Sequence, residues 1–282
     1  MNPLSVKITR PRAGGLVSRE RLFRLLDGEM EKPVIWVSAP AGSGKTALVS
    51  SYLDERRLPC IWYQCDEGDA NPATFFYYMG LAARKAVPTC RDPLPLLTSE
   101  YLEGIPAFTR RYFEILYSRL ASRYGSRKPG SSSRSKRGGA PNVAIVLDNV
   151  QEVPDDSMFH EMVAHGLDVI PEAVIVLVLS RGDPPSPLAR LRAGGKIGRV
   201  ASGELRFSVE ESKALVRARM PDLKTNRIQE MHEKSEGWAA GIILMLERMR
   251  IQGPGSGSTG SVAYEGVFDY FAGEIFNRSD PD

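Results

Sequence analysis

Short, mostly apolar runs of strand length recur along the chain. They occupy residues 34–37, 60–65, 143–147 and 173–179, and a shorter run follows at residues 199–201. Between them, apolar residues recur at intervals of three and four positions, as on one face of an amphipathic helix. Strands that are apolar at every position are typical of parallel sheets that helices cover on both faces. The pattern therefore predicts an α/β fold in which helices flank a parallel sheet.

Several helices are also indicated by the residues that begin them. Ser18 is placed to cap a helix with leucines on one face, and Asn71, which precedes a proline, predicts the cap of another. Ser208 and Glu211 form a capping box for a third helix. Two further helical patterns lie within residues 226–250. We expect the helices after residue 203 to form a small helical subdomain.

These patterns divide the chain into an N-terminal arm, an α/β domain, a helical subdomain, a flexible linker and the start of a further domain, at residues 1–15, 16–202, 203–252, 253–261 and 262–282. The linker is rich in glycine and serine. The last segment is amphipathic but has little to pack against. We therefore expect the 282 residues to be a piece of a longer protein.

Composition narrows the class of protein. The chain is 42% hydrophobic and 25% charged, enough for one large core with a smaller one beside it. Its longest apolar run, residues 173–179, is too short to cross a bilayer, and the N-terminus lacks the apolar core of a signal peptide. We expect a soluble, cytoplasmic protein. Cys60, Cys65 and Cys90 lack metal or redox spacing, and the three histidines are scattered, so neither type indicates a site.

The net charge of +3 comes from one segment. Residues 125–139 contain five basic side chains and no acid, in a sequence of Gly, Ser and Pro that predicts a disordered surface insertion. Without those five, 32 basic residues face 34 acidic ones, a balance of −2. The folded part therefore offers no overall attraction to nucleic acid.

The first chemical motif is the stretch Ala39–Thr46, which follows the first strand and precedes a helix. Gly42 and Gly44 permit a loop whose backbone N–H groups point inward, and the following helix adds the positive end of its dipole. Lys45 would then reach the β- and γ-phosphate oxygens, and the Thr46 hydroxyl would face Mg²⁺. The sequence thus predicts a phosphate-binding P-loop.

Residues on both sides of the motif complete the predicted nucleotide site. The loop and helix start supply Pro40, Ala41, Gly42, Ser43, Gly44, Lys45, Thr46 and Ala47. Ala39 replaces the usual first glycine, which restricts positive φ there but leaves the cradle intact. Ahead of the first strand, Val17 could offer backbone contacts and an apolar wall to the adenine, with Arg19 nearby. Ordinary helix packing is the alternative for these two residues.

The run at residues 143–147 closes on Asp148, the pattern of a Walker B strand. A buried parallel strand delivers this carboxylate to the carboxyl edge of the sheet, where Mg²⁺ or its water shell would sit. Asn149 follows, where hydrolytic relatives usually carry a second acid. An amide orients water but cannot accept its proton at neutral pH. We therefore expect slow hydrolysis, unless Glu152, Asp155 or another chain supplies the base.

Two later segments are expected near the phosphates. In P-loop proteins of the additional-strand (ASCE) type, the strand at residues 173–179 lies between the P-loop strand and the Walker B strand. Arg181, just after it, would project toward the γ-phosphate, and an ordinary loop arginine is the alternative. Residues 237–241 begin the last helix with small side chains that allow close approach, so we expect them over the nucleotide.

Taken in order, these pieces resemble the N-terminal ATPase module of the large MalT-like, LuxR-type transcriptional regulators, which are STAND signalling NTPases. The matching stretches are residues 10–12 with 16–19, 39–46, 62–69, 147–149, 179–181, 235–241 and 269–271. In this family an alanine at the first P-loop position is ordinary, so Ala39 does not count against nucleotide binding.

The resemblance implies ADP in a closed resting form, and an open, self-associating form favoured by ATP and an inducer. Hydrolysis would reset the switch. It also implies a following winged-helix domain, which residues 262–282 would begin, then a helical-repeat sensor and a C-terminal helix-turn-helix. None of the three is present here in full. Neither DNA binding nor inducer recognition is therefore assigned to this chain.

The sequence thus predicts a module that binds ATP or ADP with Mg²⁺, hydrolyses ATP slowly and controls assembly of a transcription regulator. Its partners would be nucleotide, the other domains of the regulator and further copies of itself, without DNA or membrane. Two alternatives stay open. Asn149 is also compatible with a nucleotide-sensing module without catalysis, whereas the near-neutral folded surface disfavours a motor-type (AAA-type) ATPase.

Overall fold

The computed structural model describes residues 6–11, 17–88, 93–125 and 141–252. The predicted basic insertion, apart from Gly125, lies outside these ranges, as do the linker at residues 253–261 and the further domain expected at residues 262–282. No helix within the described ranges combines the length and the apolar character that a membrane crossing requires.

The strands of the described residues form one five-stranded parallel sheet with the order β2-β3-β4-β1-β5. Their bounds are Val34–Ser38 (β1), Cys60–Gln64 (β2), Val143–Asp148 (β3), Val174–Ser180 (β4) and Ile197–Val200 (β5). Each apolar run of the sequence thus corresponds to a strand, and the last strand begins two residues before the run that indicated it. β4 lies between β1 and β3, which confirms the additional-strand arrangement.

Helices and short 3-10 turns connect the strands. The helices are α2 (Glu20–Glu29), α3 (Lys45–Glu55), α4 (Pro72–Ala86), α5 (Ile105–Tyr124), α6 (Phe159–Asp168), α7 (Ala189–Ala193), α8 (Ser202–Leu205), α9 (Val209–Arg219), α10 (Thr225–Ser235) and α11 (Ala239–Gln252). The 3-10 turns are η1 (Glu67–Ala70), η2 (Ser99–Gly104), η3 (Val150–Glu152) and η4 (Ser186–Leu188).

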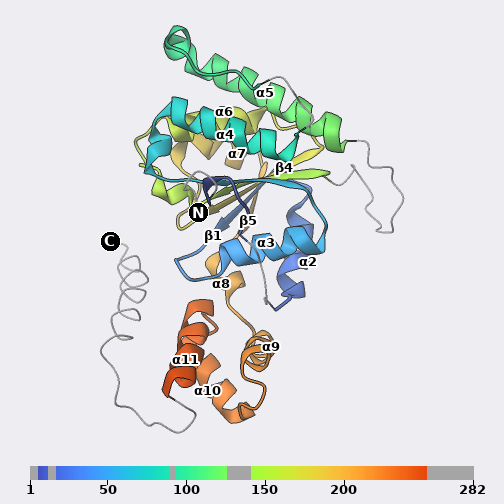
Figure 1. Ribbon diagram of the computed structural model, residues 1–282, viewed down its shortest axis with the longest axis vertical. Coiled ribbons are helices and arrows are strands. Elements are labelled where there is room, and N and C mark those ends of the chain that lie inside the picture. Colours follow the sequence, from blue (N-terminus) through green and yellow to red (C-terminus); the bar gives the residue numbers. More distant parts are fainter. Residues whose placement is uncertain (1–5, 12–16, 89–92, 126–140, 253–282) are drawn as a thin grey trace.

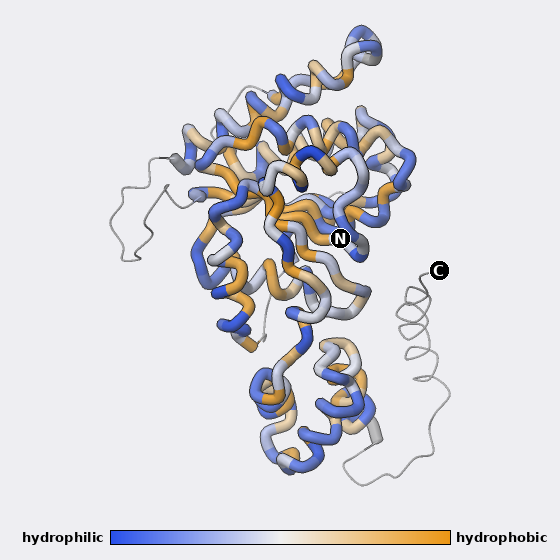
Figure 2. Tube along the Cα trace, turned by 180° about the vertical axis from the view of Figure 1, so that it is seen from behind, coloured by the Kyte–Doolittle hydropathy of each residue, from blue (hydrophilic) through white to orange (hydrophobic). Residues whose placement is uncertain are grey.

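The sheet is covered on both faces, as its apolar strands require. Helices α4, α5, α6 and α7 lie on one side of it and α2 and α3 on the other (Figure 1). Within β1, Val34 and Trp36 belong to the core under α4 and α5, whereas Ile35 and Val37 belong to the core under α2 and α3. The strands accordingly form the hydrophobic centre of the trace in Figure 2.

Two of the three predicted helix caps are confirmed. The Asn71 side chain accepts hydrogen bonds from the first amides of α4, and Ser208 and Glu211 form the capping box of α9. The prediction for Ser18 is wrong, because Arg19 holds the N-cap position of α2 and no side chain caps it. The Arg19 side chain instead donates to Glu211 across the molecule. The residue at the N-cap position thus makes a tertiary contact and does not cap the helix with its side chain.

Helices α9, α10 and α11 form a separate small core. It contains Leu215, Val216, Ile228, Met231, Ile242 and Leu246. Leu205, at the end of α8, packs instead with the core under α2 and α3. The chain thus leaves the sheet at Arg206, and the three helices after it stand apart from the sheet in Figure 1.

Of the N-terminal arm, residues 6–11 are described, and two of them contact the segments next to β2, the edge strand of the sheet. The buried Lys7 ammonium donates to Asp69 at 2.9 Å and pairs with Asp66 at 2.5 Å. Asp69 is fully buried and also accepts the hydroxyl of Tyr63. Burial lowers the pKa of Lys7, but hydrogen bonds to the two acids outweigh it and raise that pKa. Further along, Arg10 pairs with Asp54 of α3. Residues 7 and 10 therefore connect the turn after β2 with the P-loop helix.

We predict that Asp69→Ala destabilises the protein by about 3 kcal/mol, because it leaves the buried Tyr63 hydroxyl without its acceptor and the Lys7 ammonium with only the exposed Asp66 carboxylate. Urea denaturation followed by circular dichroism measures this loss. Asp183→Ala is the matched control, since Asp183 pairs with Arg199 on the surface and its removal should cost under about 1 kcal/mol. Equal losses in the two variants would contradict the importance given to the buried pair.

Candidate nucleotide-binding site

The loop between β1 and α3 has the geometry that phosphate binding requires. Gly42 and Gly44 adopt φ of 72° and 87°, which side-chain-bearing residues rarely reach. α3 begins at Lys45, so the unpaired amides of its first turn face the loop. Lys45 is buried and donates to the carbonyl oxygens of Ala39 at 2.6 Å and Pro40 at 3.0 Å. These contacts hold the ammonium within the loop.

A buried hydroxyl in the same loop lacks a partner. Within the described part of the chain, Ser43 Oγ is buried and makes no hydrogen bond. An orphaned polar atom of this kind is costly unless a ligand satisfies it. Together with the glycine conformations and the enclosed ammonium, it indicates that the loop fits a phosphate group. The predicted contact residues 40–47 all lie in this loop and the first turn of α3.

Thr46 and Asp148 meet, as expected for a magnesium site. The Thr46 hydroxyl lies 3.1 and 3.0 Å from the two carboxylate oxygens of Asp148, which is almost fully buried at the end of β3. Burial raises the pKa of Asp148, although the Thr46 hydroxyl, the Asn149 amide and the Lys45 charge oppose this effect. Mg²⁺ usually takes one or two protein oxygens and completes its shell with phosphate and water. The donor pair fits that chemistry.

Asn149 has a structural role beside Asp148. It adopts φ of 60° and ψ of 39° and begins the η3 turn. Among residues with side chains, asparagine tolerates this left-handed conformation well. The amide therefore turns the chain sharply after β3. Its side chain offers no base of useful pKa to a water molecule.

Arg181 lies at the same edge of the sheet. Ser180 at the end of β4 pairs in register with Ser38 at the end of β1, and its carbonyl accepts the N–H of Ala39. Arg181 thus follows the strand next to the P-loop. Its guanidinium forms an ion pair with Glu152 of η3 at 3.3 Å. The structure therefore brings Lys45, Asp148 and Arg181 to one edge of the sheet.

Val17 and Arg19 contact the helical subdomain. Val17 packs against the core of α9 to α11. The buried Arg19 guanidinium lies 3.9 Å from the centre of the Phe207 ring and donates to Glu211 at 2.9 Å. Burial raises the pKa of Glu211, but the contact with Arg19 opposes it, and the net effect is a lowered pKa. The predicted adenine contacts stay predictions, while the packing role is observed.

The helical subdomain packs directly on the P-loop. The Ala240 N–H donates to the Gly42 carbonyl at 3.0 Å. A methyl group at Gly42 would come within 2.7 Å of Ala240 and 3.0 Å of Trp238. The small residues at the start of α11 therefore permit the close approach that their sequence indicated. Any change in the position of the subdomain must change the surroundings of the loop.

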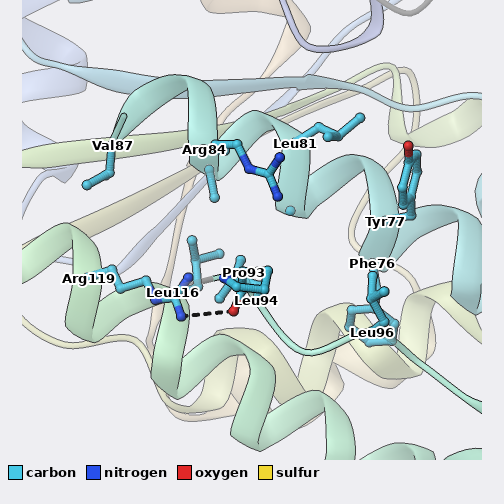
Figure 3. Close-up of a pocket in the computed structure, with 12 residues that line it drawn as sticks. Phe76, Tyr77, Leu81, Arg84, Val87, Pro93, Leu94, Leu96, Leu116 and Arg119 are labelled. Atoms are coloured by element: carbon cyan, nitrogen blue, oxygen red, sulfur yellow. Dashed lines mark hydrogen bonds between the residues drawn. The ribbon is translucent and has the colours of Figure 1, made fainter. Parts of the chain in front are cut away.

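A pocket lies between α4 and α5, away from the P-loop (Figure 3). Its lining includes Phe76, Leu94 and Leu116, and Arg119 donates to the Pro93 carbonyl at its rim. None of the predicted site residues lines it. It is thus distinct from the edge of the sheet where the P-loop lies.

Sequence reasoning missed some contacts of the site. Gln151 accepts the backbone N–H of Arg181 through its side-chain oxygen. A single glutamine in a turn carries no signal of such a role. Glu211 was recognised only as a capping residue, yet it also pairs with Arg19. Phe207 had no signal either, because stacking partners far apart in the chain are set by the tertiary fold.

Comparisons with known proteins agree with this geometry. The family model described as nephrocystin 3, N-terminal, matches residues 15–181. The HTH-type transcriptional regulator MalT of Vibrio cholerae is 23% identical over 284 residues, which cover 98% of this chain and 29% of the regulator. The chain therefore spans less than a third of the length of that relative. The resemblance to MalT-like regulators noted in the sequence is confirmed.

Solved structures support the fold. A Signal Transduction ATPase with Numerous Domains protein with a tetratricopeptide repeat sensor, from Pyrococcus horikoshii, has a TM-score of 0.55 at 16% identity, covering 96% of this chain and 34% of that one. A Walker-type ATPase of Pyrococcus abyssi has a TM-score of 0.55 at 15% identity, covering 98% of this chain and 80% of that one. The predicted P-loop NTPase fold is confirmed.

We predict that Asp148→Asn stabilises the nucleotide-free protein at pH 7 by on the order of 1 kcal/mol, while weakening Mg²⁺-dependent nucleotide binding. A raised pKa means that the stabilising contribution of this carboxyl is complete below the unfolded value of about 4 and is lost as the pH rises. The advantage of the variant should therefore disappear below about pH 4. Thermal unfolding across this pH range measures it.

Asp156→Asn is the control, because Asp156 is exposed in the turn before α6. It should change stability by less than about 0.5 kcal/mol at any pH. A loss of stability at pH 7 in Asp148→Asn would show that its hydrogen bond to Thr46 outweighs the burial of the charge.

Proposed function

The chain belongs to the nephrocystin 3 N-terminal family, and on that premise we propose that it is the ATP- and ADP-binding module of a MalT-like regulator. The module would change between a resting and a self-associating form, with slow Mg²⁺-dependent hydrolysis. One observation carries the proposal. The P-loop, with its enclosed Lys45 and orphaned Ser43 hydroxyl, adjoins the Thr46–Asp148 pair at the ends of two buried strands.

Each residue of the site would have a separate task in binding. The loop amides and Lys45 would compensate the phosphate charge, and Ser43 would gain a partner. Thr46 and Asp148 would hold the metal, directly or through water. Bound Mg²⁺ supplies charge neutralisation at the β- and γ-phosphates. Arg181, at the same edge, would distinguish ATP from ADP by the terminal phosphate.

Slow hydrolysis follows from the groups beside Asp148. Asn149 can orient a water molecule but cannot take its proton. Glu152, which could accept a proton, is paired with Arg181. Positioning and charge stabilisation remain as the means of catalysis, and they suffice for slow phosphoryl transfer.

Control of assembly would use the contact between the helical subdomain and the P-loop. Because α11 lies on Gly42, the phosphates and the subdomain share one region. A ligand shifts an equilibrium between two arrangements only if it binds them with different affinity. ADP and ATP differ there by the terminal phosphate. The partners would be the other domains of the regulator and, with ATP, further copies of the chain, without DNA or membrane.

A second candidate function is nucleotide sensing without catalysis. The left-handed Asn149 favours it, since the chain supplies no second acid next to Asp148. In that case ATP and ADP would exchange, and no phosphate would be released.

We predict that Lys45→Ala lowers the affinity for Mg²⁺-ATP at least about 100-fold, because it removes the buried charge opposite the phosphates. Isothermal titration calorimetry measures the affinity. Lys234→Ala is the matched control, since Lys234 is exposed on α10, and it should bind as the wild type does. ATP affinity unchanged by Lys45→Ala would refute the proposed function.

Single-turnover release of the γ-phosphate separates the two candidates. If the module is a slow ATPase, Arg181→Ala should reduce the rate by about 10- to 1000-fold, because the charge that develops on the terminal phosphate loses a stabilising partner. Arg190→Ala, on the short helix α7, controls for loss of a cation. Release at background in the wild type itself would favour the non-hydrolysing sensor.

A further inference from the structure

A closed ring of polar contacts holds Arg181 at both ends. Its backbone N–H donates to Gln151 Oε1 at 3.1 Å. The Gln151 side-chain amide in turn donates through Nε2 to Glu152 Oε1 at 3.0 Å. The Glu152 carboxylate in turn lies 3.3 Å from the Arg181 guanidinium. Gln151 and Glu152 thus hold the backbone N–H and the guanidinium of Arg181.

The ring is attached to the Walker B strand. Gln151 and Glu152 belong to η3, which begins directly after Asp148 and Asn149. The left-handed turn at Asn149 directs η3 toward the end of β4, where Arg181 follows. The Glu152 carboxylate that pairs with Arg181 therefore lies at the same edge of the sheet as the P-loop.

We infer that Glu152 is a positioning residue that competes with the terminal phosphate of ATP for Arg181, and that it thereby sets the preference for ATP over ADP. This rests on the proposed function of the site. A guanidinium binds a carboxylate or a phosphate in the same forked geometry, so the two anions are alternatives for it.

The competition acts on one nucleotide only. ATP must displace Glu152 in order to gain Arg181, whereas ADP has no terminal phosphate to offer and leaves the ring closed. The carboxylate therefore weakens ATP binding and leaves ADP binding unchanged. The Arg181 and Glu152 side chains are 29% and 45% exposed, so solvent limits the strength of their pair.

Glu152→Gln tests the inference, because it keeps the size of the side chain and removes its charge. We expect the ratio of ATP to ADP affinity to rise about two- to five-fold, with the change in ATP affinity alone. Calorimetry with Mg²⁺-ADP and a non-hydrolysable ATP analogue measures both affinities. The gain should shrink at high salt, since screening weakens an exposed ion pair.

Four further variants complete the design. Glu172→Gln removes the same charge from an exposed position before β4, at the far edge of the sheet, and should leave the ratio unchanged. Arg181→Ala should lower the ratio, and the double variant with Glu152→Gln should match it, because the carboxylate acts only through the arginine. Gln151→Leu opens the ring and should change the ratio in the direction of Glu152→Gln.

The outcomes are distinguishable. A wild-type protein that binds neither nucleotide would refute the proposed function itself. If it binds both and Glu152→Gln leaves the ratio equal to that of Glu172→Gln, the inference is overturned. It is also overturned if Glu152→Gln abolishes phosphate release with no change in the ratio, because Glu152 would then be a general base.

Discussion

The hydrogen bond between the Thr46 hydroxyl and the Asp148 carboxylate joins the P-loop helix to the end of β3. It connects residues that are 102 positions apart in the chain. Burial of Asp148 disfavours its charged form, so the site retains a carboxylate at a cost in stability that a purely structural residue would not carry. At the same edge Arg181 follows β4, the strand that lies between β3 and the P-loop strand β1.

The surroundings of this pair are shared between two bodies. The sheet supplies the P-loop, and the helical subdomain covers it through the start of α11. Arg19 reinforces the junction, because its guanidinium stacks on Phe207 and pairs with Glu211 across it. A ligand at the P-loop would therefore affect both the sheet and the helical subdomain. This contact is the physical basis of the proposed response of the subdomain to the nucleotide.

Much of the fold was predictable because its signals are local. Every apolar run became a strand, and the caps at Asn71 and Ser208 formed as expected, since both depend on hydrogen bonds within three residues. Ser18 was the exception. Its helix begins at Glu20, and the Arg19 at the N-cap position donates its side chain to a residue 192 positions later. A contact with so distant a partner cannot be predicted from neighbouring residues.

By itself the sequence determined the parallel sheet, the P-loop and the ends of the strands that carry Asp148 and Arg181, because periodicity and glycine placement are properties of short segments. Only the tertiary structure decided what these residues contact. The ring of Gln151 and Glu152 around Arg181 depends on the order of β3 and β4 in the sheet and on one left-handed turn. The place of β4 beside β3 was expected, but the side chains that meet there come from segments about 30 positions apart, and such a contact leaves no mark in any single stretch of sequence.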